Sequence, residues 1–321
     1  MKGLRPSVRR RHEDDSVIKS PSQGLRFLLA STSRDLEQSL RLEFPSLVAS
    51  HEPWVDWSAV DELQEGLNQC DGVILAASGC GDDVMTFSSH VRDEWLHCEQ
   101  NVANLVSKAH RVVKLSWMEG FVAETSPLAV GRATWSVEEA LKGKMGHESG
   151  KLTILRASMG MDAFLRGRLF ELVCGRTLSI SVKHGRIAFV HPLDVAETLL
   201  ALVTKEETGQ AAADDSTGRV QVVTGPEALT FPQVAQCLST GLREQVTYSY
   251  FPLWAVQPAR WIRGIAGDAI EQEVAVMRAL EAGCQQEVHT DVIETLVGHT
   301  PRSFRSFVAE HAAAWPRTDP L

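Results

Sequence analysis

Residues 71–78, DGVILAAS, form a short and almost continuously apolar run. A strand that is apolar on both faces is typical of a parallel sheet with helices packed on both sides. Two similar runs follow at 111–117 (RVVKLSW) and 152–158 (LTILRAS), and stretches with helical periodicity separate them. This alternation predicts an α/β fold built on a Rossmann-like, mostly parallel sheet.

Upstream of this run, the stretch GLRFLLASTSRD (24–35) predicts a strand over 26–30 and then a polar loop that opens a helix. Ser58 is placed to cap a further helix that turns Val60, Leu63 and Leu67 inward. Downstream, the pattern predicts an irregular stretch over 119–133 and then a helix over 134–145. Two further strands are predicted, over 185–190 and from 220, and each is followed by a helix, capped by Asp194 and by Thr230 respectively. The last predicted elements are a helix over 270–283 and a terminal helix after 300–303.

The composition narrows the class of protein. The chain has 321 residues, 44% hydrophobic and 23% charged, which suits one large or two modest globular domains. Its formal net charge of -9 argues against a general nucleic-acid binder, because phosphate neutralisation needs a basic face. No apolar run approaches the length of a membrane span, so we expect a cytoplasmic protein without a membrane partner. The cysteines and histidines lack CxxC or HExxH spacing, which predicts reduced thiols and no metal site.

Several segments occur in an order that resembles a known family: DGVILAAS, HRVVKLSW, LTILRASMGMDAF, IAFVHPLDVAE, VVTGPEALTFPQVAQCL and TLVGHTPRSFRSFVAEHAAAW. They resemble the NmrA-like branch of the atypical short-chain dehydrogenases, and within it the festuclavine and agroclavine dehydrogenases of ergot-alkaloid pathways. The combination of TGPEALTF with GHTPRSFRSFV is the specific part of this resemblance. The resemblance implies a Rossmann domain, a small carboxyl-terminal substrate domain and NADPH-dependent reduction of small molecules, although some members only sense the cofactor.

Under this resemblance, RFLLASTS corresponds to the second strand of the family, and residues 1–23 contain no GxxGxxG turn. Such glycines let backbone N–H groups approach the pyrophosphate at the start of a helix. We therefore expect weakened NADP binding. We also expect the neighbours of the absent first strand to lack partners, unless SVIK (16–19) or a partner chain replaces it. An omitted first exon and the erosion of an unused cofactor site both remain open.

The predicted organisation has three parts. Residues 1–23 form a tail, residues 24–158 form a Rossmann-like domain without its first strand, and residues 159–321 form an α+β substrate-binding region of which parts return to the sheet. A homodimer that covers the exposed sheet edge is a further prediction.

The resemblance places NADP at the carboxyl ends of the first strands, where open α/β sheets bind their ligands. Its candidate contacts are Ser31, Thr32, Arg34, Ala77 and Ser78. Arg34 stands two positions beyond the point where NADPH-preferring relatives carry an arginine for the 2'-phosphate. Its long planar side chain tolerates that offset, but a solvated residue at a helix start is an equally good interpretation.

Ser116 and His191 are the candidate catalytic residues. Ser116 matches a serine of the family and could hydrogen-bond a substrate oxygen, or it could cap a loop. His191 is a candidate for acid-base work near pH 7, or a structural residue beside a proline. Where the family often has a lysine or histidine four residues before a glutamate, this chain has Thr134 before Glu138, so the proton donor is missing.

The candidate substrate pocket consists of Trp117, Thr134, Trp135, Met159 and Met161. The tryptophans could stack on a planar substrate or simply fill volume, and the methionines could line the pocket or belong to the core. Three functions remain open: an NADPH-dependent reductase of a specialised small-molecule pathway, a non-redox isomerase or cyclase on the same scaffold, and a cofactor-sensing binding protein without catalysis.

Overall fold

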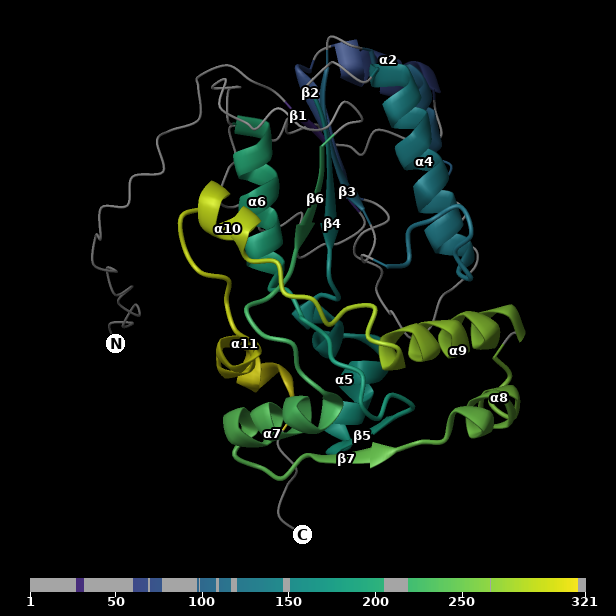
Figure 1. Ribbon diagram of the computed structural model, residues 1–321, viewed down its shortest axis with the longest axis vertical. Coiled ribbons are helices and arrows are strands. Elements are labelled where there is room, and N and C mark those ends of the chain that lie inside the picture. The colour runs from purple at the N-terminus through teal and green to yellow at the C-terminus, as the bar shows by residue number, and fades with distance from the viewer. Residues whose placement is uncertain are drawn as a thin grey trace, which may run out of the picture.

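The computed structural model describes residues 27–31, 60–68, 70–76, 97, 99–107, 110–116, 120–146, 151–204, 219–265 and 267–316. Within these residues five strands form a parallel sheet in the order β1-β2-β3-β4-β6 (Figure 1). The strands are β1 (Phe27–Ser31), β2 (Gly72–Ala76), β3 (Arg111–Ser116), β4 (Leu152–Ala157) and β6 (Arg219–Val223). The predicted α/β class with a Rossmann-like parallel sheet is confirmed.

Helices cover both faces of this sheet. Successive side chains of a strand point to opposite faces, so an apolar strand needs a helix packed on each face. Val73 and Leu75 of β2 pack in one core cluster with α2 (Val60–Asn68) and α4 (Ala129–Met145). Ile74 and Ala76 pack in a second cluster with α6 (Pro192–Thr204), on the opposite side of the sheet (Figure 1). The same alternation turns the even-numbered residues of β3 toward α4.

The pairing of β1 corrects one expectation. β1 pairs with β2 along its whole length, from Phe27 opposite Gly72 to Ser31 opposite Ala76. Because β1 and β2 are hydrogen-bonded neighbours, no strand lies between them. The expectation that strands beside an absent first strand would lack hydrogen-bond partners is therefore wrong. Parallel pairing requires only an extended segment and a crossover, which here includes α2. The SVIK segment lies outside the described residues.

A second layer lies beyond the carboxyl ends of β4 and β6. Its two-stranded parallel sheet consists of β5 (Thr177–Ile180) and β7 (Thr247–Tyr250). Around it lie η1 (Met161–Leu165), α5 (Gly167–Cys174), α7 (Phe231–Leu242), α8 (Leu253–Trp261), α9 (Gly267–Glu281), α11 (Phe304–His311) and η2 (Ala312–Ala314), while α10 (Asp291–Leu296) packs beside α6 (Figure 1). Edge-to-face contacts join Phe164 to Phe189 and to Phe304 at the centre of this layer.

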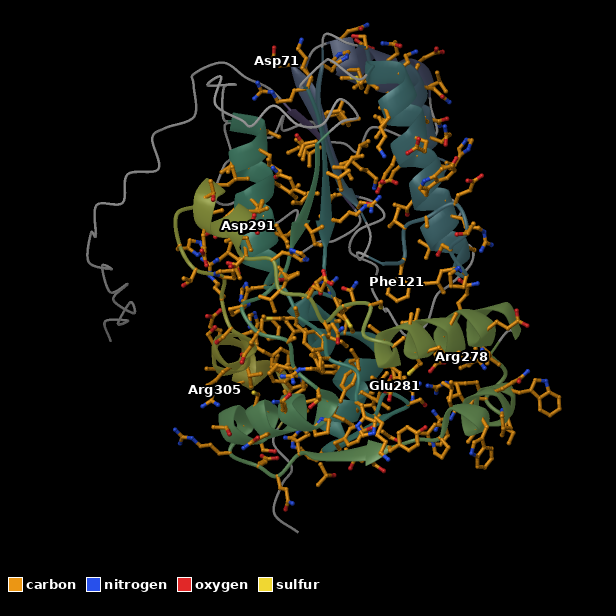
Figure 2. All side chains as sticks on the ribbon, viewed as in Figure 1. Asp71, Phe121, Arg278, Glu281, Asp291 and Arg305 are labelled. Carbon is orange, nitrogen blue, oxygen red and sulfur yellow. The ribbon has the colours of Figure 1, made fainter. Side chains whose placement is uncertain are left out.

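Several local predictions are confirmed and others are wrong. Thr230 caps α7 in a reciprocal capping box with Gln233. The helix predicted over 134–145 begins earlier, at Ala129. Its first turn packs closely against the preceding segment, since a Cβ on Gly131 would lie 2.1 Å from the Phe121 carbonyl oxygen. Figure 2 shows Phe121 between α4 and α9, where the two layers meet.

Two other predictions are wrong. The segment 185–190 forms isolated bridges to Leu229, Gln285 and Gly160 instead of a regular strand. It passes between three different segments, so no single partner extends a ladder. Val60 was predicted to point inward from its helix, but it is 47% exposed, because it is the first residue of α2.

Candidate functional site

A buried polar cluster lies at the carboxyl edge of the sheet. Ser116, the last residue of β3, and Arg156 of β4 are register partners on adjacent strands. Glu138 of α4 lies over both of them: the Ser116 hydroxyl donates a short hydrogen bond to Oε1, and Arg156 Nη2 donates to Oε2 at 2.6 Å. Ser116 and Glu138 are fully buried. The carboxylate therefore joins the ends of two strands to the helix above them.

This arrangement determines what Ser116 can offer to a ligand. Its proton is already donated to Glu138, whose negative charge is balanced by Arg156. The serine can therefore accept a hydrogen bond through its lone pairs, but it is not positioned to donate one. The cluster holds an acceptor in a fixed orientation and supplies no acid.

Thr134 lies one turn before Glu138 on the same face of α4. Its side chain is fully buried, and Oγ1 has no hydrogen-bond partner among the described residues. Leaving a buried hydroxyl unpaired costs about 1 to 3 kcal/mol. Such a group marks a position where a bound ligand can complete the hydrogen bonding. Trp135, the next residue, is partly buried against the core of the second layer.

A threonine-to-valine pair of variants checks this interpretation. We expect Thr134→Val to raise the free energy of unfolding by about 1 kcal/mol, because it removes an unsatisfied buried hydroxyl. Thr198→Val is the matched control: the Thr198 hydroxyl is equally buried but donates to the Asp194 carbonyl at 2.7 Å, so its loss should destabilise the fold. Urea unfolding of both variants measures whether each substitution raises or lowers the free energy of unfolding. Destabilisation by Thr134→Val would show that its hydroxyl serves the fold.

His191 occupies a structural position in the second layer. Its Nδ1 accepts a hydrogen bond from the Leu193 N–H at 3.1 Å and thereby caps α6, while its ring lies edge-on to Phe307. Burial lowers the pKa of His191 and outweighs the nearby Asp194 and Glu310 carboxylates, so the ring is neutral at pH 7 with its proton on Nε2. Ser116 faces α4 and His191 heads α6, so the structure does not join the two candidate catalytic residues.

The other candidate residues lie as follows. Met159 and Met161 are 1% exposed and belong to the core of the second layer. Ser31 ends β1 beside Ala76, and only its backbone is described. The remaining candidates, Thr32, Arg34, Ala77, Ser78 and Trp117, lie outside the described residues.

Sequence reasoning missed Arg156, although a signal was present. An arginine inside the apolar strand LTILRAS must find a buried partner. The same signal occurs in RVVKLSW, where the fully buried Lys114 pairs with Glu99 at 2.7 Å. A lone charge inside a two-sided apolar strand thus indicates an ion pair with the covering helix.

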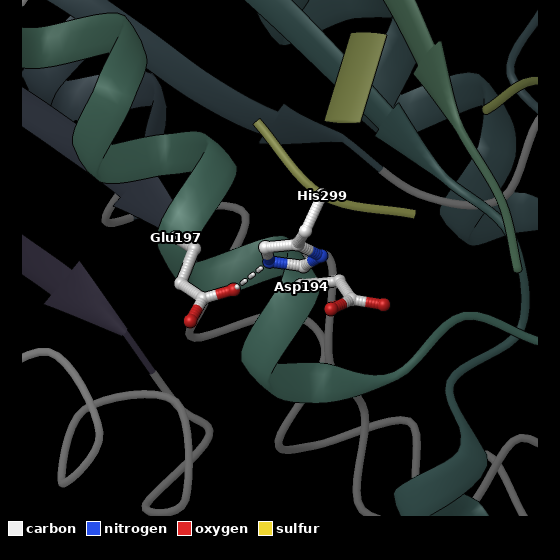
Figure 3. Close-up of side chains that lie close together, drawn as sticks. All are labelled: Asp194, Glu197 and His299. Atoms are coloured by element: carbon white, nitrogen blue, oxygen red, sulfur yellow. Dashed lines mark hydrogen bonds and ion pairs between the residues drawn. The ribbon is translucent and has the colours of Figure 1, made fainter. Parts of the chain in front are cut away.

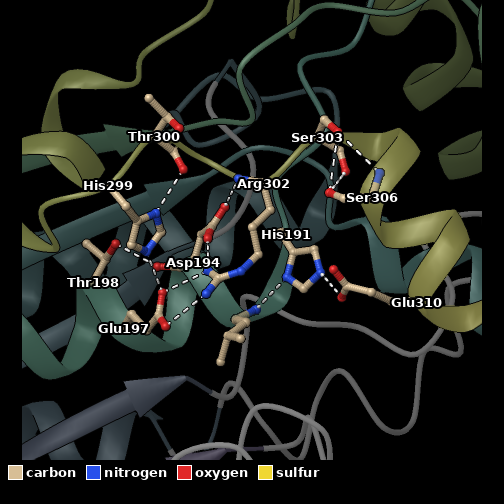
Figure 4. Close-up of polar contacts among 11 residues, drawn as sticks. His191, Asp194, Glu197, Thr198, His299, Thr300, Arg302, Ser303, Ser306 and Glu310 are labelled. Carbon is tan, nitrogen blue, oxygen red and sulfur yellow. Dashed lines mark hydrogen bonds and ion pairs between the residues drawn. The ribbon is translucent and has the colours of Figure 1, made fainter. Parts of the chain in front are cut away.

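A second polar cluster joins α6 to the segment before α11. Asp194, Glu197 and His299 bring ligand atoms within 4.8 Å of one another, as a metal site would (Figure 3). However, Arg302 already binds both carboxylates: its backbone N–H donates to Asp194 at 2.8 Å, and its guanidinium donates to Asp194 and, at 2.8 and 3.1 Å, to Glu197 (Figure 4). A metal ion would have to displace this guanidinium, so these residues do not fit a metal.

We call Asp194, Glu197, His299 and Arg302 the arginine clamp. Burial alone would raise the pKa of Glu197, but hydrogen bonds from Arg302 and His299 hold it below its ordinary value. Burial alone would lower the pKa of His299, but hydrogen bonds to the Thr300 carbonyl and to Glu197 raise it. The prediction that Asp194 caps α6 is wrong: Asp194 lies within the first turn and binds Arg302, while His191 is the cap.

These features define a fold. A parallel sheet covered on both faces, with a polar cluster at its carboxyl edge and a second layer beyond that edge, is Rossmann-like. Among solved structures, the chain is similar to a nucleoside-diphosphate-sugar epimerase of Staphylococcus aureus, with a TM-score of 0.65 and 15% identity over 89% of this chain and 100% of that one. A Citrobacter triphenylmethane reductase complexed with NADP(H) gives 0.64 and 14%, over 90% and 100% of the two chains. An Escherichia coli NADPH-dependent quinone oxidoreductase complexed with NADPH gives 0.63 and 16%, over 89% and 99%.

The sequence is similar to two curated proteins in particular. It is 27% identical over 166 residues to the oxidoreductase YesF of Bacillus subtilis, covering 51% of this chain and 54% of that protein. It is 23% identical over 169 residues to agroclavine dehydrogenase of Claviceps purpurea, again covering 51% and 54%. The resemblance drawn from the motifs is confirmed, and the chain spans about half the length of the curated relatives that it matches. No family model matches the chain. No helix in the described part of the chain is long and apolar enough to cross a membrane.

Proposed function

We propose that the chain is an NAD(P)H-dependent reductase whose substrate already carries an electron-poor carbon, such as an iminium ion. The observation that carries the proposal is the state of Ser116, whose proton is committed to Glu138 at the carboxyl edge of the sheet. With Thr134 in place of a proton donor, the described site contains hydrogen-bond acceptors and a neutral hydroxyl, but no acid. Reduction of an iminium ion needs no acid.

The chemistry of this reaction balances without a proton. When bound, reduced nicotinamide supplies a hydride. The iminium carbon would then gain a C–H bond, the C=N π pair would move to nitrogen, and the positive charge would pass from the substrate to the oxidised nicotinamide. Ser116 can accept a hydrogen bond from a polar group of the bound molecule, and the buried Thr134 hydroxyl can pair with another. The direct pairing of β1 with β2 brings their carboxyl ends together, and the candidate NADP contacts that follow them, Thr32, Arg34, Ala77 and Ser78, lie outside the described residues.

The proposed substrate class draws on the relatives. Agroclavine dehydrogenase is an alkaloid enzyme by its name, and its similarity to half of this chain supports an alkaloid-like substrate of specialised metabolism. Trp135, the residue after Thr134, is partly buried against apolar side chains, which suits a largely apolar molecule. We propose NADP as the cofactor because the reductases that share the fold were solved with NADP(H) or NADPH.

Titration of the purified chain tests this proposal. We expect NADPH to raise the melting temperature and to bind with a Kd tighter than about 1 mM. The chain should then oxidise NADPH in the presence of one member of a panel that contains a cyclic iminium ion, a quinone and a triphenylmethane dye. Binding without turnover of any member would favour a cofactor sensor.

The variant Ser116→Ala tests the role of the serine. We expect kcat/KM to fall about fivefold, since one hydrogen bond contributes roughly 1 kcal/mol. Glu138 and Arg156 still pair in this variant, so the fold should persist. Ser239→Ala is the control, because the Ser239 hydroxyl is partly buried and bonds only the backbone of α7 and Val246. An unchanged kcat/KM in Ser116→Ala would exclude the serine from the site.

A non-redox isomerase or cyclase is the second candidate. Thr134, which stands where the family often has a lysine or histidine, favours it. In this case the protein would only hold a reactive substrate in a near-attack conformation. Conversion of a substrate by a chain that shows no response to NADPH or NADH would select this candidate over the reductase.

A further inference from the structure

The outer face of α8 is apolar although it lies in solvent. Trp254 is 80% exposed, Trp261 is 75% exposed and the adjoining Ile262 is 80% exposed. Trp254 and Trp261 are seven residues apart, so they share one side of the helix, with the exposed Pro258 between them. These are the most exposed large hydrophobic side chains in the described part of the chain.

The inner face of the same helix is partly polar. Val256 and Arg260 are buried, and Arg260 binds Glu273 of α9 through two hydrogen bonds of 2.9 and 2.8 Å. Arg168 of α5 binds the same carboxylate. With a charged residue inside and two tryptophans outside, α8 departs from the usual distribution of polar residues outside and apolar residues inside. Because the ion pair holds Arg260 inside, α8 cannot rotate to bury its tryptophans without breaking a buried salt bridge.

The strand that leads into α8 presents an open edge. The N–H groups of Thr247 and Phe251 donate to β5, at Arg176 and Ile180. Backbone groups alternate in direction along a strand, so those of Tyr248 and Tyr250 point away from β5, and they have no backbone partner among the described residues. Between 247 and 263 the charged residues are the buried Arg260 and the exposed Arg263. An edge with so few charges is suited to association.

We propose that the outer face of α8, together with the free edge of β7, binds a second copy of this chain. In a two-fold symmetric pair, Trp254 of each copy lies against Trp261 of the other, which makes the surface complementary to itself. The exposed parts of Trp254, Trp261, Ile262 and Tyr250 amount to about 500 Å², taking about 200 Å² for a large aromatic side chain. This is well over half of the roughly 800 Å² that one partner buries in a stable interface.

Charge supports a second copy as the occupant. The chain carries a formal net charge of -9, so two copies repel each other over most of their surfaces. The α8 face has no acidic residue and one exposed arginine, so it is a place where two copies meet without that repulsion. An anionic lipid surface would need a cluster of basic residues, and this face offers only Arg263.

Light scattering on the purified full chain tests the proposal. We expect a mass of twice 35.3 kDa, with a dimer Kd below about 10 μM. The double variant Trp254→Glu/Trp261→Glu should have the mass of one chain and a Kd at least 100-fold weaker, with an unchanged circular dichroism spectrum, because both side chains are exposed in the single chain. Val288→Glu, which adds the same charge at a 44% exposed apolar site elsewhere, should remain dimeric.

A crosslink gives a second, independent readout. Gln257 is exposed between the two tryptophans, near the proposed two-fold axis, so Gln257→Cys should form an intermolecular disulfide on oxidation. Gln236→Cys, on the exposed side of α7, should form none beyond the background of the unmodified chain. A mass of one chain for the unmodified protein at every concentration overturns the proposal, as does a dimer that persists in the double tryptophan variant. Vesicle binding that depends on Trp254 and Trp261, with no dimer, overturns it in favour of a membrane surface.

Discussion

Replacing Arg302 with alanine is expected to lower the free energy of unfolding by about 3 to 5 kcal/mol, the usual effect of removing one partner of a buried ion pair. Asp194 is fully buried, and Arg302 supplies its guanidinium and its backbone N–H to that carboxylate. In the variant Asp194 and Glu197 remain close together without their counter-charge. Urea unfolding of the purified variant measures the loss.

The control for this variant is Arg305→Ala. Arg305 is also an arginine near the start of the last helix, but it is exposed, and we expect its removal to change stability by less than about 0.5 kcal/mol. Arg302→Lys should fall between the two, because lysine keeps the charge but cannot bind two carboxylates with a planar fork. A loss below about 1 kcal/mol in Arg302→Ala would show that the arginine clamp does not hold α6 to the following segment.

This clamp explains why two distant motifs occur together. Asp194 and Glu197 come from PLDVAE, and His299 and Arg302 come from GHTPRS, about a hundred residues later. Ser303 of the second motif then caps α11 by accepting a hydrogen bond from the Ser306 N–H at 3.2 Å. One motif therefore provides the carboxylates, and the other provides the cation and the start of the next helix.

The second large effect is expected at Gly225, in the motif TGPEALTF. An ideal Cβ at this position would lie 1.9 Å from the carbonyl oxygen of Phe189. The oxygen belongs to the backbone, and the position of a Cβ is fixed by the backbone, so no side-chain rotation relieves the overlap, and we expect Gly225→Ala to destabilise the fold by about 3 kcal/mol. The same motif is tied to the segment before α10 by the Thr224 hydroxyl, which accepts from the His289 N–H at 2.8 Å.

Gly143→Ala provides the matched control for this substitution. Gly143 lies inside α4, and an added Cβ would meet nothing within 4 Å. Alanine there should stabilise the fold by about 0.5 to 1 kcal/mol, because it reduces the conformational freedom of the unfolded chain. The two glycine variants should thus shift the midpoint of urea unfolding in opposite directions. Equal midpoints would mean that the segments around Phe189 and Gly225 can separate without loss.

The sequence by itself determined the features that depend on a few neighbouring residues. The apolar runs at 71–78, 111–117 and 152–158 contain the strands Gly72–Ala76, Arg111–Ser116 and Leu152–Ala157, which are buried on both faces because a segment with no polar face can only lie inside a covered sheet. The cap at Thr230 was predictable for a similar reason, since a capping box acts over three residues. The motif order was sufficient to recognise the resemblance to agroclavine dehydrogenase.

Only the tertiary structure decided which distant groups meet. Neighbouring residues in the sequence do not predict that Glu138 joins Ser116 to Arg156. They also do not predict that Arg302 binds the Asp194 carboxylate, which was expected to cap α6, or that β1 pairs directly with β2. A carboxylate or an extended strand can satisfy its hydrogen bonds with many partners. Which partner it finds depends on how the layers pack around it, and that packing is a property of the whole chain.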